Sequence, residues 1–159
     1  MNKRIFVWFI IAMLAVGIVG CSKEKEEDSG DKPEKSKVTI YYANSNADGF
    51  ETEEVELDAL TPENLWQELV TRNVVSAEVK ISSLTTPVED DSKKIILDLS
   101  HNFQSYFYEL GTADEYYLLG SISNTFLSAY ECESILITVD GETLESGHDV
   151  YSEYMKKFQ

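Results

Sequence analysis

The sequence predicts an α+β fold, a two-layer sandwich in which two helices pack on one face of a mostly antiparallel sheet. Two observations support this class. Segments rich in β-branched and aromatic residues are separated by turn signals, and two other segments repeat apolar residues at helical spacing. Their order along the chain is strand, helix, strand, strand, helix, strand, strand. In that order, consecutive strands can pair as hairpins and both helices can pack on one face of the same sheet, as in α+β domains.

The chain begins with a segment typical of a secretory signal peptide. Lys3 and Arg4 precede an apolar stretch over residues 5–16, which leads through small residues to Cys21. The sequence IVGC resembles the lipobox of bacterial lipoproteins, in which the cysteine is acylated and the preceding peptide is removed. We therefore expect residues 1–20 to be a lipoprotein signal peptide and Cys21 to carry a lipid that anchors the protein to the cell membrane, facing outside the cytoplasm. The alternative is a single membrane anchor that ends in an ordinary cysteine.

Residues 21–37 should form a flexible tether that starts with the lipidated cysteine. After Cys21 the segment carries five lysines, six acidic residues and no strongly apolar side chain. Nothing in it can be buried to offset the entropy of ordering the chain. Because its charge is nearly balanced, we expect a spacer rather than a clamp on anionic lipid.

Residues 38–159 have the length of one domain with its own core. Six basic residues stand against 23 acidic ones, which gives a net charge of −17. Such a surface repels nucleic acid and attracts cations or a basic partner. The alternative explanation of this acidity is solubility near the cell envelope. Cys132 is the single cysteine of this part, so no internal disulfide can form, and we expect it to be packed.

The domain opens with a strand predicted over residues 38–43, followed by a polar loop with some features of a calcium site. Oxygen-bearing side chains occupy the first, third and fifth positions of the loop and glycine the sixth: Asn44, Asn46, Asp48 and Gly49. An EF-hand loop also needs a glutamate at the twelfth position, where this chain has Val55. We therefore expect no bound metal, but a polar turn in which Gly49 supplies backbone freedom. A short strand at 54–57 should follow.

The first helix is predicted by its N-terminal signals. Thr61 fits the N-cap, Pro62 the first helical position and Glu63 the first turn. Apolar residues then fall on one face of a short amphipathic helix: Leu65, Trp66, Leu69 and Val70.

Two antiparallel strands are predicted over residues 78–84 and 94–100. The acidic residues 89–91 between them fit a solvated turn better than a cation site. The apolar run 95–97 suggests that the second strand lies centrally in the sheet. Asp98 follows that run, where alternation places it on the solvent face unless it is buried with partners.

The longest helical signal covers residues 111–130. Thr112 and Glu115 match a capping box. Apolar residues follow at spacings of three and four: Tyr116, Leu119, Ile122, Phe126 and Tyr130. A strand over 134–139 comes next, and the Asp-Gly pair at 140–141 predicts a two-residue hairpin turn.

In their order and spacing, these segments resemble the GerMN domain, which is named for the spore-germination protein GerM. Four stretches carry the resemblance: VTIYYANSNADGF, LTPENLWQEL, IILDLSHNF and GSISNTFLSAYECESILITVDGETL. Asn124, Thr125 and Phe126 correspond to the family's step of Asn, Thr and an apolar residue. The resemblance implies a non-enzymatic module outside the cytoplasm, similar to ring-building-motif domains and linked to sporulation, germination or envelope assembly. Unlike the family's sporulation members, this chain carries a single copy, followed by ESGHDVYSEYMKKFQ.

The sequence offers little for catalysis. His101 and His148 have no second histidine or cysteine at metal-ligand spacing, so we expect no zinc site. No nucleophile elbow, phosphate-binding glycine loop or zinc-protease motif is present. A Cys132 nucleophile with a histidine base stays open on the sequence alone. We expect a protein that is not an enzyme and has no cofactor.

Aromatic residues near the start of the second long helix give the first choice of binding site. The stretch QSYFYELGTADEYY should be an aromatic loop that leads into the helix. We expect Tyr106, Tyr108, Tyr116 and Tyr117 to form a binding edge. The alternative is that about half of the tyrosines belong to the core.

Two functions from different classes follow. The first is a lipid-anchored interaction or assembly module that docks on envelope proteins. The second is a lipoprotein that binds a small ligand or a cell-wall fragment through an aromatic surface or cleft. A deep aromatic pocket with convergent polar groups would favour the second function, and a shallow surface the first.

Overall fold

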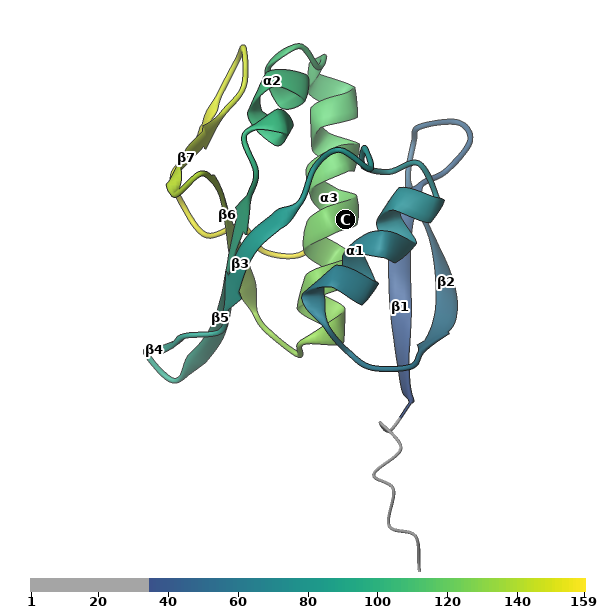
Figure 1. The fold of residues 1–159 in the computed structure, drawn as a ribbon. Helices are drawn as coiled ribbons and strands as arrows, with labels where there is room; N and C mark the ends of the chain where they lie inside the picture. The colour runs from purple at the N-terminus through teal and green to yellow at the C-terminus, as the bar shows by residue number, and fades with distance from the viewer. Residues whose placement is uncertain (1–34) are drawn as a thin grey trace, which may run out of the picture. The chain divides into compact units, whose positions relative to one another are not determined.

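The computed structural model describes residues 35–159, which contain eight strands and three helices (Figure 1). In chain order these are β1 (Ser36–Ala43), β2 (Phe50–Leu57), α1 (Pro62–Thr71), β3 (Ile81–Thr85), β4 (Val88–Glu89), β5 (Ser92–Leu99), α2 (Asn102–Tyr108), α3 (Thr112–Ala129), β6 (Ser134–Val139), β7 (Glu142–Glu145) and β8 (Val150–Tyr151). The predicted signal peptide, Cys21 and most of the predicted tether fall outside the described residues.

Strand β5 is the centre of the larger sheet. β3 pairs antiparallel with one side of β5, β6 pairs parallel with the other, and β7 and β8 follow outward. The parallel pair arises because α2 and α3 make the crossover between β5 and β6. The central position predicted for residues 95–97 is confirmed. Two tight turns also agree with the sequence, since the residues at 90–91 and 140–141 all adopt positive φ, as two-residue hairpin turns require.

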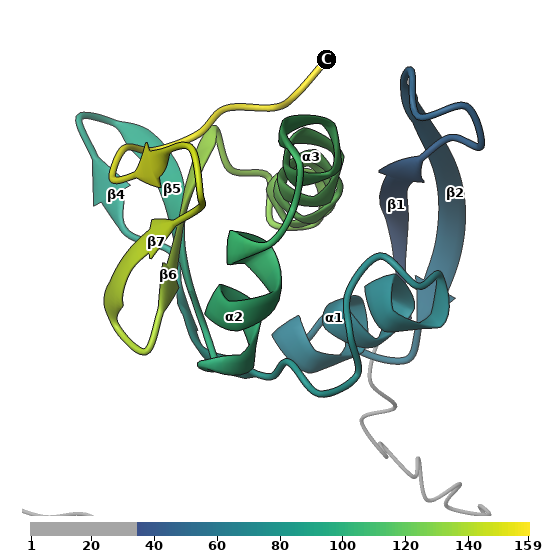
Figure 2. The ribbon, with the colours of Figure 1, turned by 90° about the horizontal axis from the view of Figure 1, so that it is seen from above.

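Strands β1 and β2 form a separate two-stranded sheet on the other side of α3. Seen from above, the larger sheet, α3 and the β1–β2 hairpin make three layers (Figure 2). The α+β class is confirmed, with a third helix and a second sheet that the sequence analysis did not include. Strand β2 begins at Phe50 and not at residue 54, where the sequence had predicted its start. It therefore pairs with all eight residues of β1 and forms a full-length hairpin.

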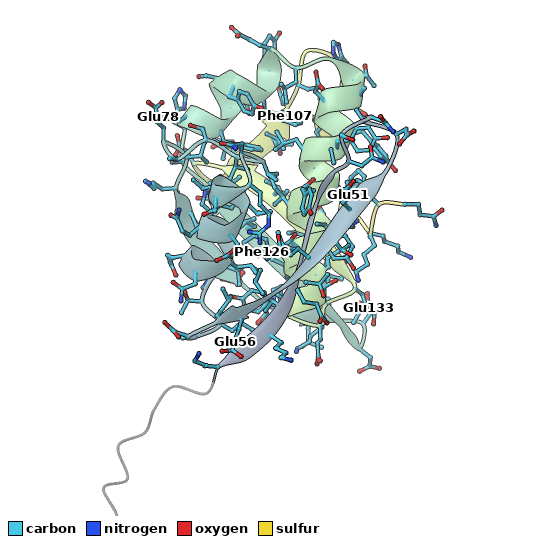
Figure 3. All side chains as sticks on the ribbon, turned by 90° about the vertical axis from the view of Figure 1, so that its right-hand side faces the viewer. Glu51, Glu56, Glu78, Phe107, Phe126 and Glu133 are labelled. Atoms are coloured by element: carbon cyan, nitrogen blue, oxygen red, sulfur yellow. The ribbon has the colours of Figure 1, made fainter. Side chains whose placement is uncertain are left out.

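The segment predicted as an aromatic loop contains the helix α2. Phe103 and Phe107 lie one helical turn apart and are both fully buried, with their rings stacked at 5.5 Å between centroids. Figure 3 shows Phe107 and Phe126 among the side chains packed between the layers. The loop prediction was wrong because a single apolar pair is too short a signal to reveal helical periodicity among tyrosines.

Helix α3 is buried all round rather than along one face. Every residue from 118 to 127 is buried, as expected of a helix enclosed by other elements. Tyr116, which was assigned to the apolar face, is 39% exposed. The single-face description of this helix was therefore wrong.

Two adjacent polar residues of α3 bind backbone on two different neighbours. The Thr125 hydroxyl accepts a hydrogen bond from the Tyr41 backbone N–H of β1 at 2.9 Å. Asn124 donates to the Phe158 carbonyl at 3.1 Å and accepts from the Phe158 N–H at 2.8 Å. Both side chains are buried, where an unpaired polar group would be costly. The Asn-Thr step therefore fixes the hairpin and the C-terminal segment to the same helix.

The capping box predicted at the start of α3 was wrong. The N-cap is Gly111, which makes no side-chain hydrogen bond, and Thr112 is the first helical residue. Glu115 is instead buried and accepts a hydrogen bond from the Tyr151 hydroxyl of β8. Burial, followed by this hydrogen bond, raises the pKa of Tyr151. A tertiary partner has thus replaced the local cap.

Replacing Asn124 with alanine should lower the free energy of unfolding by about 2 kcal/mol, because the Phe158 N–H and carbonyl would lose their partner. Urea denaturation measures this change. Asn46→Ala is the matched control, since its exposed side chain makes no hydrogen bond among the described residues and should change stability by less than about 0.5 kcal/mol. Equal effects of the two substitutions would contradict the anchoring role of Asn124.

Candidate functional site

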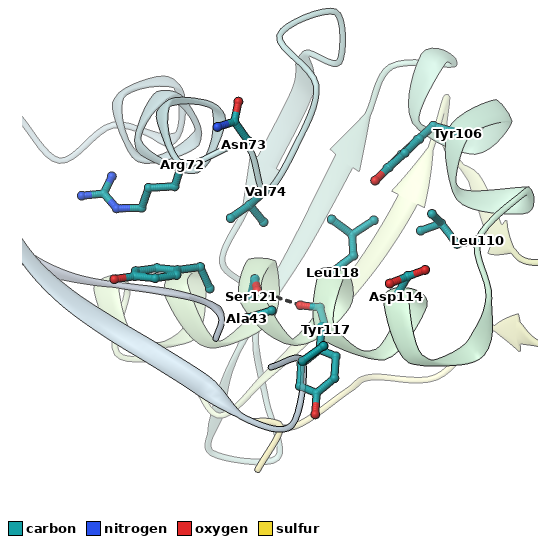
Figure 4. A pocket seen from close by; sticks show the side chains of 12 residues that line it. Ala43, Arg72, Asn73, Val74, Tyr106, Leu110, Asp114, Tyr117, Leu118 and Ser121 are labelled. Atoms are coloured by element: carbon teal, nitrogen blue, oxygen red, sulfur yellow. Dashed lines mark hydrogen bonds between the residues drawn. The ribbon is translucent and has the colours of Figure 1, made fainter. Parts of the chain in front are cut away.

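A shallow cleft lies where the ends of β1 and α1 meet α2 and the first half of α3 (Figure 4). Its volume is about 370 Å³ and it is partly open to solvent. Apolar lining comes from Val74, Leu110 and Leu118, and polar lining includes charged groups and three tyrosines. A second hollow of about 440 Å³ beside Tyr116 and residues 155–159 is more open still. The first cleft is therefore the better candidate for a site.

Arg72 lies at one end of the cleft and joins the β1–β2 hairpin to α1. Its guanidinium donates to Glu53 Oε2 from Nη2 at 2.7 Å and from Nε at 3.0 Å. Nη1 donates to Glu68 Oε2 at 2.7 Å. Burial lowers the pKa of Arg72, but the hydrogen bonds to Glu68 and Glu53 outweigh burial and leave that pKa above its ordinary value. Two carboxylates therefore already neutralise this cation.

The position of Arg72 follows from the way α1 ends. Arg72 is the C-cap, and Asn73 adopts the left-handed conformation at φ 57°, which asparagine tolerates better than most residues. The Asn73 N–H donates to the Val70 carbonyl at 2.9 Å, and the Val74 N–H to the Leu69 carbonyl at 3.0 Å. These bonds close the last helical turn and direct the chain along the cleft, which Asn73 and Val74 both line.

Tyrosines and one carboxylate line the opposite end of the cleft. Tyr106 comes from α2, while Asp114 and Tyr117 lie three residues apart on α3 (Figure 4). Phe50 and Tyr116 each pack edge-on against the Tyr117 ring, with 5.3 Å between centroids. Because T-shaped contacts favour one ring orientation, they hold Tyr117 as a fixed wall.

The predicted binding edge of four tyrosines is divided by the structure. Tyr106 and Tyr117 both line the cleft. Tyr116 turns to the C-terminal segment instead, where its hydroxyl donates to the Gln159 carbonyl at 2.8 Å and its ring lies 5.1 Å from that of Phe158. Tyr108 is 58% exposed and lies outside the cleft. Tyr42 also lines the cleft, and the sequence did not predict this. Its position in the first strand gave no sign that it would lie near α2 and α3.

The polar loop after β1 is a turn bonded to itself. Asn44 Oδ1 accepts from the backbone N–H groups of Asn46 and Asp48, both at 3.2 Å, and Asn44 Nδ2 donates to Asp48 Oδ1 at 2.7 Å. The polar-turn prediction is confirmed. The left-handed residue is Ala47, at φ 51°, and not Gly49, so the backbone freedom expected of Gly49 is not used.

Other candidate groups of the sequence are engaged elsewhere. His101 is exposed and lies 3.2 Å from the Asp140 carboxylate. Cys132 is buried, as predicted, and burial raises the pKa of its thiol. Asp98 is half-buried and accepts from the Thr138 hydroxyl at 2.7 Å and the Gly141 N–H at 2.8 Å, so it is partnered rather than solvated.

Within residues 35–159, no three histidine, cysteine, aspartate or glutamate side chains converge as a metal site requires. Among those same residues, none of the helices combines the length and the apolarity needed to cross a bilayer.

Most of the domain, from within β1 to the end of β7, matches a known family. The family model for Germane, described as sporulation and spore germination, matches residues 39–145. This chain belongs to the Germane family. The resemblance to GerMN domains is thereby confirmed. The Germane match ends at Glu145, before the C-terminal segment that Asn124 binds.

Solved structures are also similar to this Germane domain. A candidate lipoprotein from Clostridium perfringens is 18% identical, with a TM-score of 0.43, over 77% of this chain and 88% of that chain. The tandem GerMN domains of the sporulation protein GerM from Bacillus subtilis are also 18% identical, with a TM-score of 0.49. That similarity covers 78% of this chain and 46% of the tandem chain, so this chain spans less than half of its length. No curated protein matches in sequence.

Replacing Arg72 with methionine should lower the free energy of unfolding of the Germane domain by about 1–2 kcal/mol, because Glu53 and Glu68 would lose their shared cation. Urea denaturation measures the loss. Lys80→Met removes the same charge from an exposed lysine whose ammonium group donates only to the Ala77 carbonyl, and should cost less than about 0.5 kcal/mol. Similar losses in both variants would attribute the effect to net charge and not to the Arg72 bridge.

Proposed function

We propose that this protein is a lipid-anchored lipoprotein outside the cytoplasm whose Germane domain is a non-catalytic interaction or assembly module in sporulation, germination or envelope assembly. The observation that carries the proposal is the family match over residues 39–145. The signal-peptide pattern and the lipobox cysteine at position 21 support the anchor. The cell membrane is thus one partner, and an envelope protein is the other.

The state of the candidate reactive groups supports a non-catalytic role. A nucleophilic cysteine needs thiolate character, yet burial raises the pKa of the Cys132 thiol. Among the carboxylates singled out by the sequence, Asp98 accepts two hydrogen bonds within the sheet and so is held as a structural group. Glu53 and Glu68 are likewise bound to Arg72. These groups stabilise the fold in the positions that they occupy.

The shape of the surface favours docking over ligand capture. The cleft of about 370 Å³ is open on one side and lies at the lower end of the size range for small-molecule sites. The second candidate function, binding of a small ligand or cell-wall fragment, draws support from Tyr106 and Tyr117 in the same cleft. Partner capture separates the two functions.

Affinity capture from native envelope should recover a stoichiometric protein partner. The tag belongs inside the tether, between Ser29 and Gly30, because Phe158 and Gln159 at the C-terminus bind to α3. Cells that carry the untagged protein provide the control for background. Recovery of cell-wall glycan without a protein partner would favour the second function, and recovery of neither would count against the assembly role.

The lipid anchor at Cys21 has a direct test. Labelled palmitate should enter the wild-type protein, while Cys21→Ala should remain unlabelled and leave the membrane fraction, because the thioether lipid has no attachment point. Cys132→Ala is the matched control, since that cysteine is buried in the domain and should leave labelling unchanged. Equal labelling of wild type and Cys21→Ala would remove the anchor from the proposed function.

A further inference from the structure

We propose that the cleft between α1, α2 and α3 binds a lysine or arginine side chain that projects from a basic segment of the partner protein. The inference rests on the proposed function and names the chemistry by which the partner is recognised. Asp114 supplies the negative charge, and Tyr106 and Tyr117 supply aromatic faces beside it.

The charges of the cleft select a cation. Its basic residue, Arg72, is neutralised by Glu53 and Glu68 at the far end. The Asp114 side chain makes no hydrogen bond and no ion pair with any residue in the range 35–159, and it is exposed at the cleft. The surrounding domain carries 23 acidic residues against six basic ones. An anionic ligand such as a phosphate would be repelled, whereas a cation would be drawn in.

The aromatic residues narrow the class of cation. A carboxylate beside aromatic faces suits an ammonium or guanidinium group, which can form a charge-assisted hydrogen bond and a cation–π contact together. The chain makes such contacts with its own lysines: Lys94 lies 4.6 Å from the centroid of Tyr154 and Lys157 lies 5.6 Å from that of Tyr41. Within the described residues, no cation lies over Tyr106, whose side chain is 44% exposed and so can accept one from a partner.

The cleft is held in shape before anything binds. Phe50 and Tyr116 both pack against the ring of Tyr117 and hold its orientation. Tyr106 projects from α2, which is anchored by the buried rings of Phe103 and Phe107. A preformed site loses little conformational entropy on binding. A volume of about 370 Å³ is enough for a side chain that projects from the partner.

The cleft and the start of the described domain lie at opposite ends of β1. The tether enters the domain at Ser36, the first residue of β1, while Tyr42 and Ala43 at the other end of that strand line the cleft (Figure 1). Six residues of extended strand separate these points by about 20 Å. The cleft therefore lies at the end of β1 away from the residue where the described strand begins.

A labelled basic peptide tests the site in the full chain, purified in non-ionic detergent. Fluorescein-labelled Gly-Arg-Gly-Arg-Gly should bind, as measured by anisotropy, and Asp114→Asn should weaken binding about five-fold, the scale of one charge-assisted contact. Asp91→Asn removes the same charge from an exposed turn outside the cleft and should weaken binding less than about two-fold. Equal effects would overturn the inference, because they would indicate diffuse attraction only.

A second pair of variants tests the aromatic faces. Tyr106→Ala should weaken peptide binding about three-fold or more, as expected for loss of an exposed cation–π contact. Tyr108→Ala alters a more exposed tyrosine of the same helix that does not line the cleft, and should leave binding unchanged. Unchanged binding by Tyr106→Ala, or stronger displacement of the probe by an N-acetylglucosamine trimer than by free arginine, would overturn the inference. Thermal unfolding of each variant checks that the fold is intact.

The capture experiment distinguishes failure of this inference from failure of the proposed function. A tagged Asp114→Asn, Tyr106→Ala protein should lose the partner that the wild type recovers. Retention of the partner by this double variant would overturn the cleft as the docking site and leave the assembly role standing. If the wild type captures no partner, the assembly role fails, and the peptide titrations still decide whether the cleft binds cations.

Discussion

The structure depends on a helix that is buried on all sides and yet carries polar groups. Residues 118–127 of α3 are inaccessible, and two of them, Asn124 and Thr125, reach outward to the backbone of other segments. Each satisfied hydrogen bond contributes about 1 kcal/mol, whereas an orphaned partner costs about 1–3 kcal/mol. Because leaving one of these groups unpaired costs more than pairing it gains, the hairpin and the C-terminal segment can dock only in the register that pairs these groups. Specificity of packing thus comes from the polar atoms, while the apolar contacts supply most of the stability.

A glycine on the same helix connects the fold to the cleft. A Cβ at Gly120 would collide with the ring of Phe50 and come within 3.1 Å of the Phe158 side chain. Glycine costs about 1 kcal/mol in a helix interior relative to alanine, but here it lets the hairpin and the C-terminal segment approach α3 closely. Phe50 in turn packs on Tyr117, which forms a wall of the cleft. The shape of the candidate site therefore depends on a backbone approach that only glycine permits.

The sequence predicts what local chemistry controls and misses what distant partners control. The N-cap of α1 was predicted because the Thr61 hydroxyl binds a backbone N–H three residues away. The capping role of Glu115 was not realised, because Tyr151, 36 residues later, binds that carboxylate. The cleft is the extreme case, since its lining comes from four elements, including Tyr42, Arg72 and Tyr106, whose proximity no local pattern encodes. Two of the four predicted tyrosines, Tyr106 and Tyr117, do line the cleft. They lie on α2 and α3, which are neighbours in both sequence and space.

The acidity of the domain has more than one physical cause. Four glutamates lie on β2, which has β1 as its single neighbouring strand, and Figure 3 shows Glu51 and Glu56 near the two ends of that hairpin. Charge on an exposed edge prevents pairing with another chain, so these residues have a role in solubility. Asp114 has no such role, because it lies in a helix beside tyrosines and away from any sheet edge. On β2, Glu53 and Glu56 also form ion pairs with Arg72 and Lys35. Asp114 lies in the first turn of α3, where the helix dipole favours a carboxylate, and its side chain is free to meet a cation from a partner.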